Sequence, residues 1–165
     1  MSPPFPTRVR LTNVSDEDLL MADPFSIAVG ALTVAGIARS VGKAVRKLHA
    51  FKTAQGDFSA LQNEVSDVEA VLQQVASVTY SPVLPGQEEQ SDITLRGHID
   101  RAKGQLLELE KLIAYVLTSY DDQAKGKVDK SAWLKQQNKL RSLRKGLRNV
   151  RMNLALSIAT VTLSV

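Results

Sequence analysis

Apolar residues recur at alternating steps of three and four positions in three separate stretches of this 165-residue chain. This spacing places the apolar side chains along one face of an α-helix, whereas a half-buried strand would need strict alternation. Each stripe is narrow, so each helix must bury it against partner helices. The first stripe consists of Phe58, Leu61, Val65, Val68, Leu72 and Val75. The second consists of Ile99, Ala102, Leu106, Leu109, Ile113, Val116 and Tyr120. The third consists of Trp133, Leu140, Leu143, Leu147, Val150, Leu154, Ile158 and Val161.

Turn and capping residues predict where these three helices begin and end. The dipeptide Gly56-Asp57 marks a break before the first, and prolines and a glycine in residues 80–92 predict a loop after it. Asp92 is a candidate cap for the next helix, and the last helix is expected to begin near Ser131. Residues 157–165 are β-branched, but a lone strand would have no partner, so we predict helix. No glycine or proline terminates this last helix, so we expect the chain to be cut inside or just after it, as in an excised N-terminal module.

A further helix is predicted to begin near Asp23 or Pro24, because Asp is a good N-cap and Pro suits the first helical position. Four helices with matching seams predict an all-α fold, an antiparallel helical bundle over residues 21–165. The prolines of residues 1–20 predict a disordered leader. Apolar positions of the first helix are Phe25, Ile27, Leu32, Val34, Ile37, Val41, Val45 and Leu48.

Charge is divided unevenly along the chain, although the net charge is only +4. Residues 57–122 are strongly acidic, and residues 123–165 hold ten basic residues and one acidic residue. We expect acidic helices to lie beside a basic helix, so that the charges partly cancel. The alternative is a basic face open to anionic lipid or nucleic acid. Its residues are Lys135, Lys139, Arg141, Arg144, Lys145, Arg148 and Arg151.

The residue types that carry catalysis are not arranged for it in this sequence. There is no cysteine, and His49 and His98 have no partners at metal-ligand spacing, so both are expected at a surface or a helix end. No glycine-rich phosphate loop is present, and no carboxylates are paired in an apolar context. We therefore predict a protein that is not an enzyme and that has no cofactor and no metal site.

Residues 24–38 contain no charged residue and are apolar all round, unlike the other three helices. They are too short to span a bilayer alone, since spanning takes about 20 apolar residues. Extension to Val45 reaches that length, with Arg39 and Lys43 near one end. The segment is expected to be a central core helix packed against the other three at rest. The functional interpretation, a helix that is buried at rest and enters a membrane after release, is compatible with this, because a two-state element needs only a few kcal/mol between its packings.

Small residues in this segment predict close approach by another helix. Gly30, Gly36 and Gly42 recur every six residues, and four alanines lie among them. Such small-residue surfaces allow helix backbones to come together in membranes.

Three stretches resemble the fungal HeLo-like N-terminal domains that precede STAND and NACHT-type receptors and ankyrin-repeat proteins, and that include the azaphilone-pigment cluster protein L type. They are MADPFSIAVGALTVAGIA from Met21, LLELEKLI from Leu106, and WLKQQNKLRSLRKGLRNVRMNLALSI from Trp133. The resemblance covers residues 21–165. Two departures stand out: twenty residues precede Met21, and no nucleotide-binding or repeat region follows.

The resemblance implies a helical bundle whose first helix serves membrane-directed programmed cell death, in heterokaryon incompatibility or innate immunity. It implies self-association, a cytoplasmic protein that moves to the plasma membrane on activation, contact with an anionic membrane surface, and a STAND-type receptor as regulatory partner. The membrane and oligomerisation positions carried over are Phe25, Ile27, Gly30, Leu32, Val34, Gly36, Ile37, Val41 and Gly42.

Two other classes of function compete with this expectation. One is a soluble helical protein–protein interaction module without membrane activity. The other is a nucleic-acid binder that uses the basic last helix. Against the latter, the basic residues are spread around the apolar seam, and few aromatic residues are present for base stacking.

Overall fold

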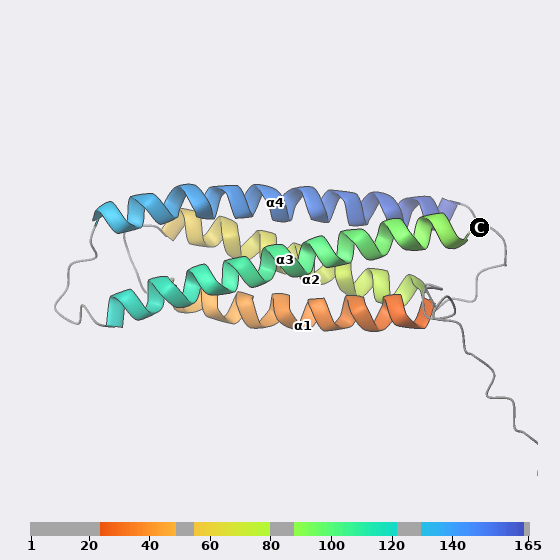
Figure 1. Ribbon diagram of the computed structural model, residues 1–165, viewed down its shortest axis with the longest axis horizontal. Helices are drawn as coiled ribbons and strands as arrows, with labels where there is room; N and C mark the ends of the chain where they lie inside the picture. Colours follow the sequence, from red (N-terminus) through yellow and green to blue (C-terminus); the bar gives the residue numbers. More distant parts are fainter. Residues whose placement is uncertain (1–23, 49–54, 80–87, 122–129, 164–165) are drawn as a thin grey trace, which may run out of the picture.

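The computed structural model describes residues 24–48, 55–79, 88–121 and 130–163, and all of them are helical (Figure 1). The helices are α1 (Pro24–Leu48), α2 (Gln55–Thr79), α3 (Glu88–Asp121) and α4 (Lys130–Leu163). The predicted all-α bundle is therefore confirmed. The predicted leader, residues 1–20, lies outside the described residues.

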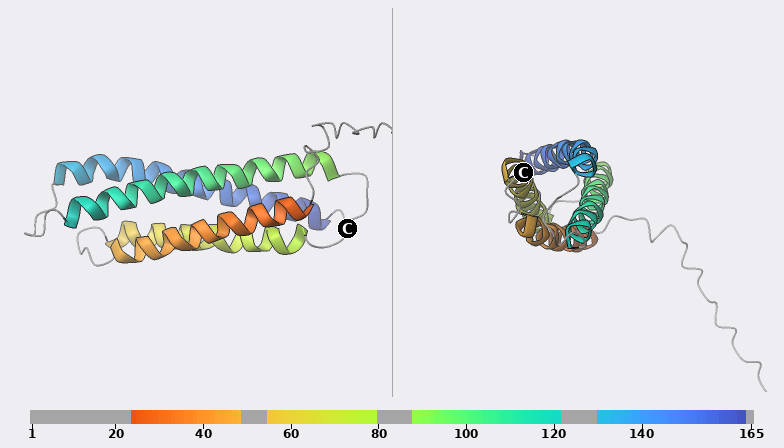
Figure 2. Two further views of the ribbon diagram at one scale, coloured as in Figure 1. Left: turned by 60° about the horizontal axis from the view of Figure 1, so that its bottom comes forward. Right: turned by 90° about the vertical axis from the view of Figure 1, so that its left-hand side faces the viewer.

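Each helix runs antiparallel to the one before it in the chain, but the helices are not arranged around the bundle in chain order (Figure 1). α1 packs against α2 and α3, and α4 packs against the same two helices. The end-on view in Figure 2 shows the resulting ring, in which α2 and α3 occupy opposite corners. Two neighbouring pairs, α1 with α3 and α2 with α4, consequently run in the same direction.

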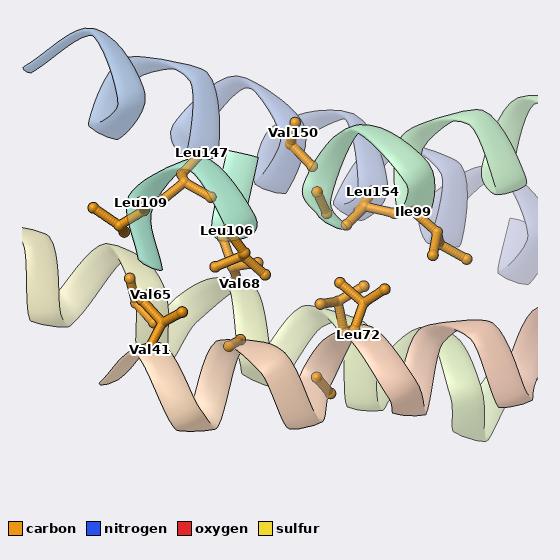
Figure 3. Packing of buried hydrophobic residues seen from close by; sticks show 14 of the residues in the cluster. Val41, Val65, Val68, Leu72, Ile99, Leu106, Leu109, Leu147, Val150 and Leu154 are labelled. Atoms are coloured by element: carbon orange, nitrogen blue, oxygen red, sulfur yellow. The ribbon is translucent and has the colours of Figure 1, made fainter. Parts of the chain in front are cut away.

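The predicted seams form the core. All six residues of the α2 stripe are buried, as are most residues of the α3 and α4 stripes, whereas Val116 and Val161 are half-buried. Figure 3 shows representatives from all four helices meeting in one layer of side chains, with Leu106, Leu147 and Leu154 opposite Val41 and Leu72. The side chains of Tyr120 and Trp133 lie outside those that the structure describes.

The expected start is right for α1 and within one residue for α4. The expected starts of α3 and α2 need correction. α3 begins at Glu88, so residues 88–92, predicted as loop, are helical, and Asp92 lies in the second turn rather than at the cap. Acidic residues such as Glu88 and Glu89 are favoured at a helix N-terminus, because the helix dipole is positive there. α2 begins at Gln55, which places Asp57 in the first turn.

α1 does not lie at the centre of the bundle, so the expectation of a helix packed against the other three is wrong. Its inner face is built largely from alanines, and Ala28, Ala31 and Ala38 have no exposed surface. Its outer face is open, with Phe25 58% and Leu32 48% exposed. A corner helix can bury only the part of its surface that faces its two neighbours.

Charged side chains cross the seam between α2 and α4. Arg151 donates to Glu64 (Nε to Oε1, 2.9 Å) and also lies 3.2 Å from Asp67, and Arg148 lies 3.6 Å from the other oxygen of Glu64. Glu64 is only 5% exposed, and no other charged residue among those described is buried. Further along, Gln137 donates to Asp57 at 3.0 Å. Acidic and basic helices therefore lie side by side and partly cancel, as expected.

Leu147→Asp should unfold the domain or abolish soluble expression, because it places an unpaired carboxylate among fully buried side chains, at a cost of several kcal/mol. Leu156→Asp is the matched control, since Leu156 lies on the same helix but is 65% exposed. Thermal melting followed by circular dichroism compares the two. Equal melting temperatures would mean that the α4 seam is misplaced.

Glu64→Gln should lower stability by about 1–3 kcal/mol, because Arg148 and Arg151 lose the carboxylate that they share in a buried site. Asp67→Asn should cost at most about 1 kcal/mol, because its side chain is half exposed and screened by water. Urea unfolding of both variants measures the difference. A larger loss for Asp67→Asn would contradict the central role of Glu64.

Candidate functional site

At one end of the bundle, three of the four helices carry no charged residue, and we call their segments there the charge-free end. The N-terminal half of α1 and the C-terminal ends of α2 and α4 meet there, at the right-hand end of Figure 1. No charged residue occurs in residues 24–38, 70–79 or 152–163. These three segments are far apart in the chain, and the bundle brings them to a common end.

Seven of the nine exposed large apolar side chains among the described residues lie at this same end. In α1, Phe25, Val29 and Leu32 follow at steps of four and three residues, so they form one stripe on the outer face. Contiguous exposed apolar patches on a folded domain mark contacts with proteins or membranes. The other four are Ile93 of α3 and Met152, Leu156 and Leu163 of α4, whereas Tyr115 and Leu134 lie toward the opposite end.

α3 interrupts the charge-free end. Glu88, Glu89, Asp92, Arg96, Asp100 and Arg101 lie in its first four turns. Arg96 donates to the hydroxyl of Ser26 in α1 at 2.7 Å. The neutral surface therefore runs from α1 over α2 to α4, and α3 closes the ring with charged residues.

The residues predicted to engage membrane fall on two faces of α1. Phe25, Leu32 and Gly36 are exposed, and Gly30 and Ile37 are half-buried. Ile27, Val34, Val41 and Gly42 are buried. Within the described residues, Phe25–Leu48 is the helix long and apolar enough to cross a membrane, with a mean hydropathy of 1.5 over a window that is 44% buried. A buried core helix has the same length and composition.

The three glycines of α1 do not share a face. A six-residue step rotates a helical position by about 240°, so each glycine points in a different direction. Gly42 faces α2, where an added Cβ would lie 3.4 Å from Gln62 Nε2, whereas nothing lies within 4 Å of the Cβ positions of Gly30 and Gly36. Only Gly30 and Gly36 are therefore open to a helix from outside.

Three of the seven basic residues predicted on α4 pair with carboxylates of neighbouring helices. Arg148 and Arg151 contact α2, and Lys139 lies 3.7 Å from Glu108 of α3. Hydrogen bonding and the positive charge of Lys111, with the charge of Lys139, lower the pKa of Glu108. No salt bridge to a described carboxylate engages the other four basic residues, which are Lys135, Arg141, Arg144 and Lys145.

A second basic surface, which we call the α1–α2 groove, escaped the sequence analysis. It is a depression of about 290 Å³ with Arg39, Lys43 and Arg46 on one side and Gln62 and Ser66 on the other. The cations recur at steps of four and three residues, so the sequence alone could have shown that they share one face of a helix. The polar side chains opposite them belong to another helix, and no local sequence pattern predicts that the two helices pack together. The remaining lining residues are Ala38, Gly42, Val65 and Glu69.

The histidines give no sign of a metal centre. His98 lies well inside α3 and is half-buried, not at a helix end, and its Nδ1 is buried without a hydrogen-bond partner. Burial and the nearby charge of Arg101 lower its pKa. His49 lies outside the described residues, and among those described no three His, Cys, Asp or Glu side chains cluster as metal ligands.

Comparisons with protein-family models, with curated proteins and with solved structures gave no match for this chain. The resemblance to HeLo-like domains, and the role that it implies, therefore stay predictions from three sequence segments.

Proposed function

We propose that this chain is an effector or signalling domain of the fungal cell-death and innate-immunity type, which self-associates and engages membrane through α1. The observation that carries the proposal is the charge-free end, where the apolar stripe of α1 is exposed in the folded bundle. In this proposal the domain has no catalytic role, resides in the cytoplasm, and moves to the plasma membrane when a STAND-type receptor or another regulatory partner activates it.

The two faces of α1 suggest two stages of membrane contact. Phe25, Val29 and Leu32 are exposed, so they can enter the apolar part of a bilayer while the bundle stays intact. Deeper insertion would require α1 to leave α2 and α3, which uncovers the buried residues Ile27 and Val34. Hydrocarbon, or α1 from a second copy, would have to cover those side chains again, because exposed apolar surface is costly in water.

The length of the charge-free segment of α1 limits how deeply it could insert. Residues 24–38 span about 22 Å along a helix. This is more than one leaflet of bilayer hydrocarbon, about 15 Å, and less than the whole hydrocarbon core, about 30 Å. The first cation of α1, Arg39, follows directly after the charge-free segment. A helix inserted from its N-terminal end would therefore place Arg39 near the headgroups, where cations are tolerated.

The second candidate is a soluble protein–protein interaction module. It is favoured by the burial of the alanine face of α1, which makes α1 an integral part of the core. In such a module the exposed apolar residues would contact a partner protein, and α1 would never leave the bundle. Membrane binding separates the two candidates, since this one requires none.

Leu32→Glu should abolish membrane binding and toxicity, because it places a charge in the hydrocarbon, at a cost of about 2.5–3.5 kcal/mol on insertion scales for comparable charges. Leu32 is half exposed in the bundle, so the folded state should tolerate the change to within about 0.5 kcal/mol. Vesicle flotation, dye release and expression in a fungal host measure the loss.

Leu134→Glu is the matched control, because Leu134 is 59% exposed at the opposite end of the bundle. It should bind and permeabilise vesicles as the wild type does. If a folded Leu32→Glu variant kept its toxicity, the membrane mechanism would be wrong and the interaction module would replace it.

Gly36→Leu should preserve membrane binding but prevent assembly and dye release. Nothing lies within 4 Å of the added Cβ, so the fold accommodates the change, whereas a helix from another copy would meet a bulky side chain. Gly104→Leu is the control, since Gly104 is equally open but lies on α3. Cross-linking on vesicles measures assembly in both variants. The prediction would be contradicted if Gly36→Leu formed the same oligomers as Gly104→Leu and the wild type.

A further inference from the structure

We propose that the α1–α2 groove binds a phosphate group, carried either by a lipid headgroup or by a soluble phosphate ester. The groove is close in volume to the smallest ligand pockets of proteins, which begin at about 300 Å³. The wall on α1 carries three cations, and the wall on α2 carries a hydroxyl, a carboxamide and the carboxylate of Glu69.

The groove has an excess of positive charge. Arg39 is held by Glu69, with 2.9 Å between Nε and Oε1, and this pair neutralises itself. No salt bridge to a described carboxylate engages Lys43 or Arg46. Lysine and arginine are the side chains that bind phosphate best, lysine as a point charge and arginine through a fork of two donors. The unneutralised charge of Lys43 and Arg46 therefore suits an anion.

The wall on α2 supplies neutral donors. Gln62 Nε2 donates to Ser66 Oγ across 3.4 Å, a long bond that holds the carboxamide weakly. Gln62 Oε1 is buried and has no donor. Because the carboxamide is so loosely held, it can turn its N–H groups toward a ligand, and the Ser66 hydroxyl can rotate to donate as well.

Gly42 keeps the groove open. A Cβ at this position would lie 3.4 Å from Gln62 Nε2 and 3.7 Å from Val65 Cγ1, which is ordinary contact. An alanine would thus fit the fold but occupy space beside the carboxamide. Gly42 also costs helix stability relative to alanine, and the open groove offers a reason for its presence.

The position of the groove favours a lipid as the source of the phosphate. It begins at Ala38, where the charge-free segment of α1 ends. If the charge-free end enters the bilayer, the groove lies at the level of the headgroup phosphates. This choice of source rests on the proposed function, whereas the phosphate site itself does not.

The first experiment titrates the full chain with inorganic phosphate and with pyrophosphate and follows backbone amide signals by NMR. We expect saturable shifts at Gly42 and Ser66. The double variant Lys43→Gln/Arg46→Gln should weaken binding at least tenfold, because both free cations are gone. The matched control, Lys135→Gln/Arg141→Gln on α4, removes the same charge and should bind as the wild type does. Absence of saturable shifts, or equal weakening in both variants, would overturn the proposal.

A single substitution tests the groove without changing any charge. Gly42→Ala should raise the melting temperature, because alanine favours helix, and yet weaken phosphate binding several-fold by filling the groove. Gly36→Ala is its control, since that position is open to solvent, and it should stabilise the fold without affecting binding. Unchanged binding in Gly42→Ala would count against the groove as the site.

A third experiment identifies the source, using vesicles of phosphatidylcholine with and without phosphatidic acid. Recruitment by phosphatidic acid that is lost in Lys43→Gln/Arg46→Gln assigns the site to a lipid phosphate. Phosphate binding in solution without such recruitment assigns it to a soluble ester. Either result supports the phosphate site, and Leu32→Glu tests the membrane role of α1 separately, because it leaves the groove intact.

Discussion

The whole structure depends on closing four narrow apolar seams on one core. Each seam turns inward, and most of the seam residues are buried in one core cluster. The charge-free first part of α1, residues 24–38, is apolar all round, and a helix at one corner of a ring cannot bury its whole circumference. The exposed stripe of Phe25, Val29 and Leu32 is thus a geometric consequence of placing such a helix in a ring.

The order of the helices determines how the charges are balanced. With α2 next to α4, the carboxylates of Glu64 and Asp67 meet Arg148 and Arg151. In an arrangement that followed chain order, α2 would adjoin α3, which carries seven acidic and four basic residues. The observed ring therefore brings opposite charges together, and the burial of Glu64 requires this, because an unpaired buried carboxylate is strongly unfavourable.

The sequence allowed the helices and their inward faces to be predicted, because both follow from a local period of three and four residues. Val68, Leu109 and Leu154 are buried as that period requires. The ring order could not be predicted, since the seams of α2, α3 and α4 are alike in composition and a local pattern does not say which helix packs beside which. The start of α3 was missed, because prolines and a glycine nearby suggested a longer loop.

For the candidate sites too, the features of a single helix could be predicted from the sequence, and the features that depend on how the helices pack could not. The open stripe of α1 could be anticipated only as part of an apolar segment, because the sequence does not say which face its neighbours cover. The glycines at positions 30, 36 and 42 look like a single repeat in the sequence, but a helix places them on different faces. The α1–α2 groove combines cations of one helix with Gln62 and Ser66 of another, so it exists only after the two helices have packed.

The charge-free end is the feature that folding explains least. Successive helices run in opposite directions, so a neutral end requires uncharged residues in the first half of α1 and in the last turns of α2 and α4. Outward positions such as Thr33, Gln73 and Gln74 are exposed, and charged side chains there would cost the bundle almost nothing. At the opposite end the helices do carry charges on their outer faces. Core packing thus accounts for the apolar seams and leaves the neutrality of this outer surface to be explained by what it contacts.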